Sequence, residues 1–169
     1  NMHSEYAENL PKWQRYRDAV AGEDAVKDRG EAYLPKKSIK QSAEEYNAYV
    51  KRAMYFNAAG RTKEGLTGLL DRVPPSLTFP EAMREIIDDV TMDGISLAEM
   101  IRQAEDDTIT VGRAGILVDY PPTDADGPQT LAEYERAGGR PYATYYHAEA
   151  ITNWEERRVG NRKLTTRVV

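Results

Sequence analysis

The sequence contains no cysteine, and only two of its 169 residues are histidines. The lack of cysteine excludes disulfide frameworks, thiolate zinc sites, iron–sulfur clusters and cysteine nucleophiles. His3 and His147 are not spaced as an H-x-x-x-H pair, which argues against a histidine-based metal site. The longest apolar runs, such as Gly115–Val118, are far shorter than the roughly 20 residues that cross a bilayer. The sequence therefore predicts no membrane span.

Motifs of catalysis and phosphate binding are also missing. No G-x-S-x-G elbow occurs, and the glycine pairs Gly65-x-x-Gly68 and Gly112-x-x-Gly115 match neither phosphate-loop pattern. The first five residues have neither the basic nor the apolar region of a secretory signal. We therefore expect a protein that is not an enzyme, needs no cofactor and is made in the cytoplasm.

The charge of the chain is unevenly distributed. The sequence has 23 basic and 28 acidic residues, a formal net charge of −5. Residues 85–135 hold 13 acids and 2 bases, a net of −11, so the flanks carry +6. A solvated acidic face explains this split, and so does a head-to-tail assembly in which an acidic face meets a basic one. The sequence favours neither interpretation over the other.

Apolar periodicity predicts helices in the first two thirds of the chain. Pro11–Ala21 carries apolar residues at helical spacing and is followed by Gly22. Ser42 and Glu45 form a capping box for a helix that we expect to reach Gly60. Further helices are predicted at 61–71, from Pro80 to the Asp93–Gly94 turn, and after Ser96, which forms a second capping box with Glu99.

The period changes at residue 112. Ile116–Tyr120 predicts a buried strand, residues 130–137 a short helix, and residues 142–147, 151–157 and 163–169 further strands, the last two joined by a turn at Gly160-Asn161. The predicted class is α+β, with N-terminal amphipathic helices followed by a small, mostly antiparallel sheet. We expect residues 2–111 to form a mainly helical part and 112–169 a strand-rich part of the same domain. The last strand has no turn after it, which suggests a fragment cut at its C-terminus, and Asn1 before Met2 suggests an expression scar.

Two acidic patterns are candidate sites. Asp124, Asp126, Gly127 and Glu133 match positions 3, 5, 6 and 12 of a calcium loop, but position 1 is Pro122, so a polar surface turn is favoured over calcium. The pairs Asp88-Asp89 and Asp106-Asp107 resemble carboxylate dyads. Neighbours on a helix point in different directions, so we interpret all four as solvent-facing acids.

Several short motifs occur in an order typical of one family. They are Trp13-Gln14 with Arg17-Asp18-Ala19, Gly22-Glu23 with Ala25-Val26-Lys27, Tyr33-Leu34-Pro35, Tyr46-x-x-Tyr49-x-x-Arg52-Ala53, Asn57-Ala58-x-x-Arg61-Thr62-x-x-Gly65-Leu66-x-Gly68, Gly112-Arg113-x-Gly115-Ile116-Leu117-Val118-Asp119-Tyr120-Pro121 and Ile151-x-Asn153-Trp154. Over nearly the whole chain, this series resembles a portal-like family of tailed-phage and prophage structural proteins, often described as a domain of unknown function. Asp71 departs from the family pattern, which has an aromatic residue in an F-R-x-x-P stretch.

The resemblance implies a portal-like fold and a structural role. Portal subunits assemble, typically as dodecamers, into a ring at one capsid vertex of the virion, after synthesis in the cytoplasm of the bacterial host. The terminase drives double-stranded DNA through the ring without sequence recognition, and neck or tail proteins attach to it. An acidic chain suits such a conduit, because it avoids the phosphate contacts that make DNA binding tight.

We expect the acidic stretch from Glu85 to Glu135 to include subunit-contact or channel surface. The candidate residues are Glu85, Asp88, Asp89, Asp106 and Asp107. Two other classes remain open. One is a helical protein–protein interaction adaptor of phage or bacterial origin, with no role as a DNA conduit. The other is a carboxylate metal hydrolase, which would need Asp119, Asp124, Asp126 and Glu133 to converge on an ion.

Overall fold

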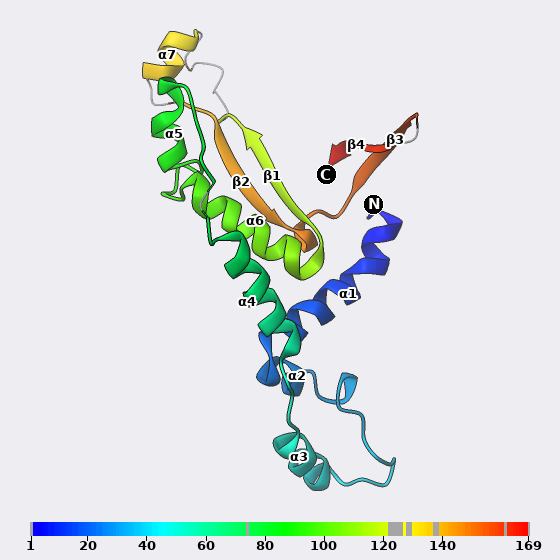
Figure 1. The fold of residues 1–169 in the computed structure, drawn as a ribbon. Helices are drawn as coiled ribbons and strands as arrows, with labels where there is room; N and C mark the ends of the chain where they lie inside the picture. Colours follow the sequence, from blue (N-terminus) through cyan, green and yellow to red (C-terminus); the bar gives the residue numbers. More distant parts are fainter. Residues whose placement is uncertain are drawn as a thin grey trace. The chain divides into compact units, whose positions relative to one another are not determined.

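The structure, a computed structural model, describes residues 2–73, 75–121, 127, 130–136, 139–160 and 162–168. The chain divides into two compact units, which are described separately below. Unit 1 comprises residues 1–74 and 109–111, and unit 2 comprises residues 75–108 and 112–169. In the described residues, six α-helices precede two antiparallel pairs of strands, and a short seventh helix lies between the strands of the first pair (Figure 1). The α+β class is confirmed, but the strands form two separate two-stranded sheets rather than one.

Unit 1 is helical. Its elements are α1 (Ser4–Ala21), α2 (Glu23–Asp28), a 3-10 turn (Gly30–Ala32), α3 (Ala43–Arg52) and α4 (Ala58–Leu70). Helix α1 begins well before Pro11, where the sequence placed its first turn, because His3 caps it by accepting a hydrogen bond from the Glu5 N–H. Tyr6 and Trp13 lie two turns apart on the same face of α1. Both are buried, and their rings meet edge to face with centroids 5.8 Å apart.

Helix α3 begins as predicted and ends earlier than predicted. Ser42 and Glu45 form the expected reciprocal capping box, but the helix stops at Arg52 rather than near Gly60. The residues that follow are held by the end of α1. The Tyr55 hydroxyl donates to the Ala19 carbonyl at 3.0 Å, and Asn57 Nδ2 donates to the Val20 carbonyl at 2.9 Å. Asn57 also caps α4, since its Oδ1 accepts from the Gly60 N–H. These tertiary hydrogen bonds outweigh the helical pattern of the segment.

A carboxylate fastens α1 to the turn after α2. Asp18 accepts hydrogen bonds from Arg29 Nε at 2.7 Å and from the Tyr33 hydroxyl at 2.6 Å. Burial acts to raise the pKa of the Asp18 carboxyl, but the hydrogen bonds from Arg29 and Tyr33 and the charge of Arg29 outweigh it, so the pKa lies below its ordinary value. Asp18 therefore stays ionised and holds the two elements together.

Unit 2 contains one longer helix and all the strands. Its elements are a 3-10 turn (Glu81–Met83), α5 (Arg84–Asp88), α6 (Leu97–Val111, whose last three residues belong to unit 1), β1 (Ala114–Asp119), α7 (Leu131–Arg136), β2 (Tyr142–His147), a 3-10 turn (Ala148–Ala150), β3 (Trp154–Val159) and β4 (Arg162–Val168). The helix predicted from Pro80 is shorter than expected, because the chain leaves the helix at Asp89, whose side chain bonds to a distant arginine. Strand β2 has the predicted bounds.

Strands β1 and β2 form the first pair. Their register runs from Ala114 opposite His147 to Asp119 opposite Tyr142. Ile116, Leu117 and Val118 are 47%, 47% and 68% exposed, so the prediction that this strand is buried is wrong. Residues 116 and 117 point to opposite faces of a strand, and therefore both faces of β1 expose apolar side chains.

The second pair is the β3–β4 hairpin. Val159 lies opposite Arg162, and Gly160, at φ 61°, supplies the left-handed backbone that its turn requires; the predicted turn partner Asn161 lies outside the described residues. Trp154, at the base of the hairpin, is buried. The residues from Glu155 to Gly160 are exposed, and so are those side chains of β4 that the structure describes.

Candidate functional site

A buried polar cluster in unit 2 joins α6 to β2. Asp107, on α6, is only 4% exposed. One of its oxygens, Oδ2, accepts a short hydrogen bond from the Tyr145 hydroxyl and lies 2.6 Å from His147 Nδ1. Tyr145 and His147 share a face of β2, because side chains two residues apart on a strand point the same way. The interpretation of Asp107 as a solvent-facing acid is therefore wrong.

The helical pattern explains the burial of Asp107. Met100, Ala104, Asp107 and Val111 recur at intervals of four and three residues and form one stripe of α6. Met100 and Val111 are buried with Asp107. A carboxylate on an apolar stripe needs hydrogen-bond donors, and β2 provides two of them. The stripe and the alternation of residues 145 and 147 were the signals in the sequence that could have identified this cluster.

The cluster resembles half of a catalytic triad. A carboxylate that accepts from His147 Nδ1 fixes the tautomer in which Nε2 is free to act as a base, and the His147 side chain is 64% exposed. Nucleophilic catalysis also needs a hydroxyl or thiol within reach of Nε2. The contacts that the structure shows are those from Asp107 to Tyr145 and His147, and they tie helix α6 to strand β2.

A second carboxylate ties the end of α5 to the segment before β2. Arg140 donates from Nη2 to Asp89 Oδ2 at 2.8 Å and from Nη1 to the Asp89 carbonyl at 2.6 Å. The Ala143 N–H donates to the Val90 carbonyl at 2.7 Å, so the loop after α5 covers part of the outer edge of β2. Partial burial acts to raise the pKa of Asp89, but hydrogen bonds such as that from Gly94 N–H and the charge of Arg140 hold the pKa below its ordinary value.

The five acids proposed as assembly surface therefore differ in what they do. Asp88 is exposed at the end of α5, Asp106 is half-buried, and Glu85 lies in α5 with its side chain outside the described residues. Asp89 and Asp107 bond within the chain, as described above. The structure thus leaves Asp88 of these five as the carboxylate that is plainly presented to solvent.

The calcium interpretation falls largely outside the described residues. Asp124 and Asp126 lie outside the described residues. Glu133 lies in the first turn of α7, where its Oε2 accepts from the Thr130 N–H at 3.1 Å and its own N–H donates to Thr130 Oγ1. This reciprocal pair is a helix cap. In the described part of the chain, no group of three or more His, Asp or Glu side chains is arranged to hold a metal ion.

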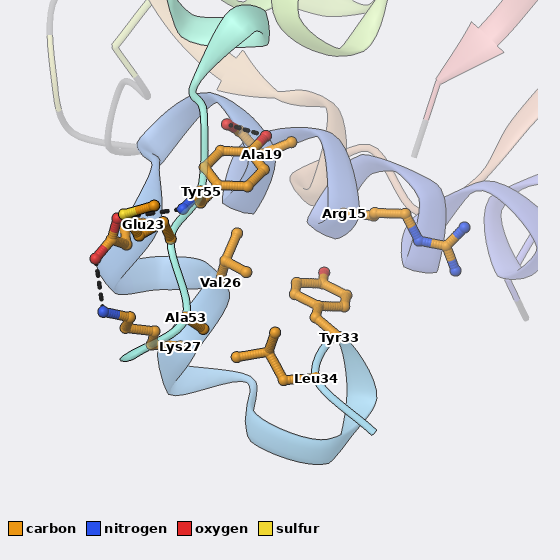
Figure 2. A pocket seen from close by; sticks show the side chains of 10 residues that line it. Arg15, Ala19, Glu23, Val26, Lys27, Tyr33, Leu34, Ala53 and Tyr55 are labelled. Carbon is orange, nitrogen blue, oxygen red and sulfur yellow. Dashed lines mark hydrogen bonds and ion pairs between the residues drawn. The ribbon is translucent and has the colours of Figure 1, made fainter. Parts of the chain in front are cut away.

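Unit 1 contains an apolar pocket of about 310 Å³ between α1, α2 and the segment after α3. Figure 2 shows Val26, Tyr33 and Leu34 converging at its centre. Glu23 and Lys27, which form an ion pair of 2.6 Å, lie on one side, and Arg15 lies on the other. The lining suits an apolar side chain rather than a charged metabolite.

The two strand pairs leave hydrogen-bonding edges open. β1 pairs only with β2, and β4 pairs only with β3, within the residues that the structure describes. An open edge presents a row of backbone N–H and C=O groups that can pair with another chain. These edges and the apolar side chains on them are the features of unit 2 best suited to binding another protein.

Comparison with known proteins gave no match to any protein-family model or to any curated protein. None of the helices in the described residues is both long enough and apolar enough to cross a membrane.

Proposed function

We propose that this chain is part of a structural subunit of a phage portal ring, the head–tail connector through which double-stranded DNA is packaged and ejected. Its partners are other copies of itself, the terminase, and neck, tail and capsid proteins. The chain works by assembly rather than by chemistry, and DNA passes it without sequence recognition. The resemblance in the ordered motifs is the origin of this proposal.

Contacts between two of those motifs support it. Gly115, from the Gly112-Arg113-x-Gly115 motif, lies so close to Ile151 that a Cβ on the glycine would be 2.7 Å from Ile151 Cδ1. Arg113 lies over the Trp154 ring, with 3.8 Å between the guanidinium carbon and the ring centroid. Ile151 and Trp154 are the ends of the other motif. Residues that are nearly 40 positions apart in the sequence thus build one contact, as expected of motifs that specify a shared fold.

Exposed apolar side chains carry the assembly part of the proposal. Large exposed side chains include Met54, Phe56, Leu69, Leu70, Val73, Ile116, Leu117, Val118, Val159, Leu164 and Val168. Apolar surface on this scale is typical of chains that are buried against partners.

The distribution of charge supports a head-to-tail arrangement. A ring needs two unlike and complementary faces on each subunit. The acidic residues 85–135 and the basic flanks provide charges of opposite sign. Asp88, Asp93 and Glu99 are exposed acids in this stretch, and Arg157 and Arg162 are exposed bases in the β3–β4 hairpin. Such complementarity speeds association and suppresses pairing of like faces.

The decisive experiment is the molar mass of the full-length gene product by light scattering, with negative-stain images of the same fraction. We expect a high-order oligomer that appears as rings with a central hole. A discrete monomer or dimer at all concentrations would contradict the portal proposal. That result would favour the helical interaction adaptor, for which the apolar pocket of unit 1 is the natural partner site.

A further inference from the structure

Strand β1 lacks the features that protect an open edge. Natural edge strands avoid pairing with other chains by carrying charges, prolines or bulges. From Ala114 to Val118, β1 has none of these, and its register with β2 is regular. Its exposed Ile116, Leu117 and Val118 add apolar side chains to the free backbone groups. A strand of this kind is a site for the addition of another strand.

The two strands of the hairpin differ in how well they could fill that edge. The pairing of the two strands shifts near Glu155: Glu155 lies opposite Arg167 and Glu156 opposite Thr165, which leaves Thr166 of β4 as the extra residue. The β3 side chains from 155 to 158 are all charged. β4 has the uncharged residues Leu164, Thr165 and Thr166 in succession, and within the described residues its outer edge is open. β4 therefore offers an uncharged segment for pairing, whereas β3 does not.

The hairpin also needs additional contacts. A two-stranded hairpin is marginally stable in water without packing on one face. In this one Trp154 is buried at the base, whereas Val159, Leu164 and Val168 are 56%, 49% and 58% exposed. A third strand would pair the free edge of β4 and cover part of this apolar surface.

Charge favours a second copy of this chain as the partner. Residues 154–168 contain five basic and two acidic residues, whereas residues 85–135, which include β1, carry a net charge of −11. Two β1 edges would bring acidic regions together, and two hairpins would bring basic ones together. Only the unlike pairing brings opposite charges together. Among the described residues neither edge has a partner strand, so each chain can give β4 to one neighbour and accept β4 from another.

We propose that β4 of one copy pairs with the open edge of β1 in the next copy, so that the β1–β2 sheet is extended across the interface. The contact is heterologous and repeats from copy to copy. This inference deepens the proposed function. It rests on the portal proposal in one respect only, that the repeated contacts close into a ring.

Cysteine cross-linking tests the pairing directly, because the natural chain has no cysteine. Val118→Cys on β1 and Leu164→Cys on β4 are made in separate preparations of the 169-residue chain, each with a tag of different size. The preparations are mixed, oxidised and run on a non-reducing gel. Thr166→Cys, at the extra residue of β4, covers a second register. Ile39→Cys in unit 1 is the exposed control.

We expect V118C mixed with L164C or with T166C to form mixed-tag dimers. The linkage should be at least tenfold faster than in three controls: V118C alone, L164C alone, and either of these variants mixed with I39C. The double variant V118C/L164C, or V118C/T166C if that register is the one that links, should give a ladder of linked oligomers. Fast V118C–V118C linkage would overturn the proposal in favour of like-to-like pairing. An intrachain disulfide in the double variant would show that the chain fills its own edge. No preferential linkage in either register, with circular dichroism unchanged, would also overturn it.

The same readouts separate this inference from the proposed function. Rings of the full-length product without the unlike cross-link would leave the portal proposal intact and remove this interface. Unlike cross-links without rings would place the interface in an open or smaller assembly and contradict the portal. Suppression of cross-linking in a longer gene product, compared with the 169-residue chain, would identify its additional residues as the occupant and overturn the second-copy proposal.

Discussion

Asp107 and His147 meet through Oδ2 and Nδ1 at 2.6 Å, and one of the two is buried while the other faces solvent. The carboxylate lies on the apolar stripe of α6, and the imidazole extends from β2. With the Tyr145 hydroxyl on the same oxygen, this contact gives the helix and the strand a fixed relationship. It also explains why a carboxylate can occupy a helix face otherwise lined by apolar residues.

Replacing Asp107 should therefore destabilise unit 2. Asp107→Asn keeps the size of the side chain but weakens its acceptance of the Tyr145 and His147 hydrogen bonds in a buried place. We expect a loss of about 1–3 kcal/mol in the free energy of unfolding, the usual cost of leaving a buried polar group poorly paired. Asp88→Asn, at an exposed acid, is the matched control and should change stability by less than about 0.5 kcal/mol. Urea unfolding measures both. Equal effects of the two substitutions would contradict the role assigned to Asp107.

The contact between Gly115 and Ile151 leads to a second prediction. A methyl group at residue 115 would lie 2.7 Å from Ile151 Cδ1, and overpacking of this kind costs about 1–3 kcal/mol. Gly115→Ala should lower the melting temperature, and adding Ile151→Val, which removes that Cδ1, should restore part of the loss. A double-mutant cycle measures this coupling.

Glycines in α4 provide the control for that experiment. Gly68 has no atom within 4 Å of the position that a Cβ would take. Gly68→Ala should therefore stabilise the helix by roughly 0.5–1 kcal/mol, because glycine is entropically costly inside a helix. A loss of stability at Gly68 as large as that at Gly115 would show that the close contact with Ile151 is not the cause.

The lowered pKa of Asp18 predicts how unit 1 responds to acid. Burial opposes ionisation, but Arg29 and Tyr33 hold the pKa of Asp18 below the ordinary value of 3.8. The contribution of the ionised carboxylate to stability is therefore complete well above pH 3.8 and is lost as the pH falls through the lower folded pKa. The difference in unfolding free energy between the natural chain and Asp18→Asn should be largest near neutral pH and shrink below about pH 4. A difference that stays constant from pH 7 to pH 3 would contradict this assignment.

Local signals in the sequence predicted much of the fold, and tertiary contacts account for the differences. The capping box of Ser42 and Glu45 acts within four residues, so the start of α3 was predictable. The end of that helix was not, because Tyr55 and Asn57 bond to carbonyls near residue 20. The β-branched run at Ile116–Val118 predicted a strand correctly, but its composition alone does not reveal that both faces remain exposed.

The assembly surface was predictable only in part, for a related reason. The sequence identifies an acidic stretch but not which of its acids have partners in the chain. Arg140 lies about 50 residues from Asp89, so that pairing leaves no local signal. The apolar stripe of α6 marks Asp107 as buried, but it does not identify His147, 40 residues away, as its partner. The open edges of β1 and β4 likewise depend on which strands pair. The sequence pattern indicates strands, whereas the structure gives their order.

Charge reversal at exposed acids tests the assembly that we propose. Reversing Asp107 would unfold the α6–β2 contact and so would report on folding rather than on assembly. Asp88 and Asp93 are exposed, so Asp88→Lys with Asp93→Lys should leave the melting temperature nearly unchanged. If acidic and basic faces meet between copies, the double reversal should weaken ring assembly of the full-length product at least several-fold at low salt. The effect should fade as salt screens the charges. The matched control is Glu44→Lys with Glu64→Lys, a double reversal of two exposed acids of unit 1 outside the acidic stretch. Assembly measured by light scattering that responds equally to both pairs, or to neither, would show that this acidic surface does not meet a neighbouring subunit.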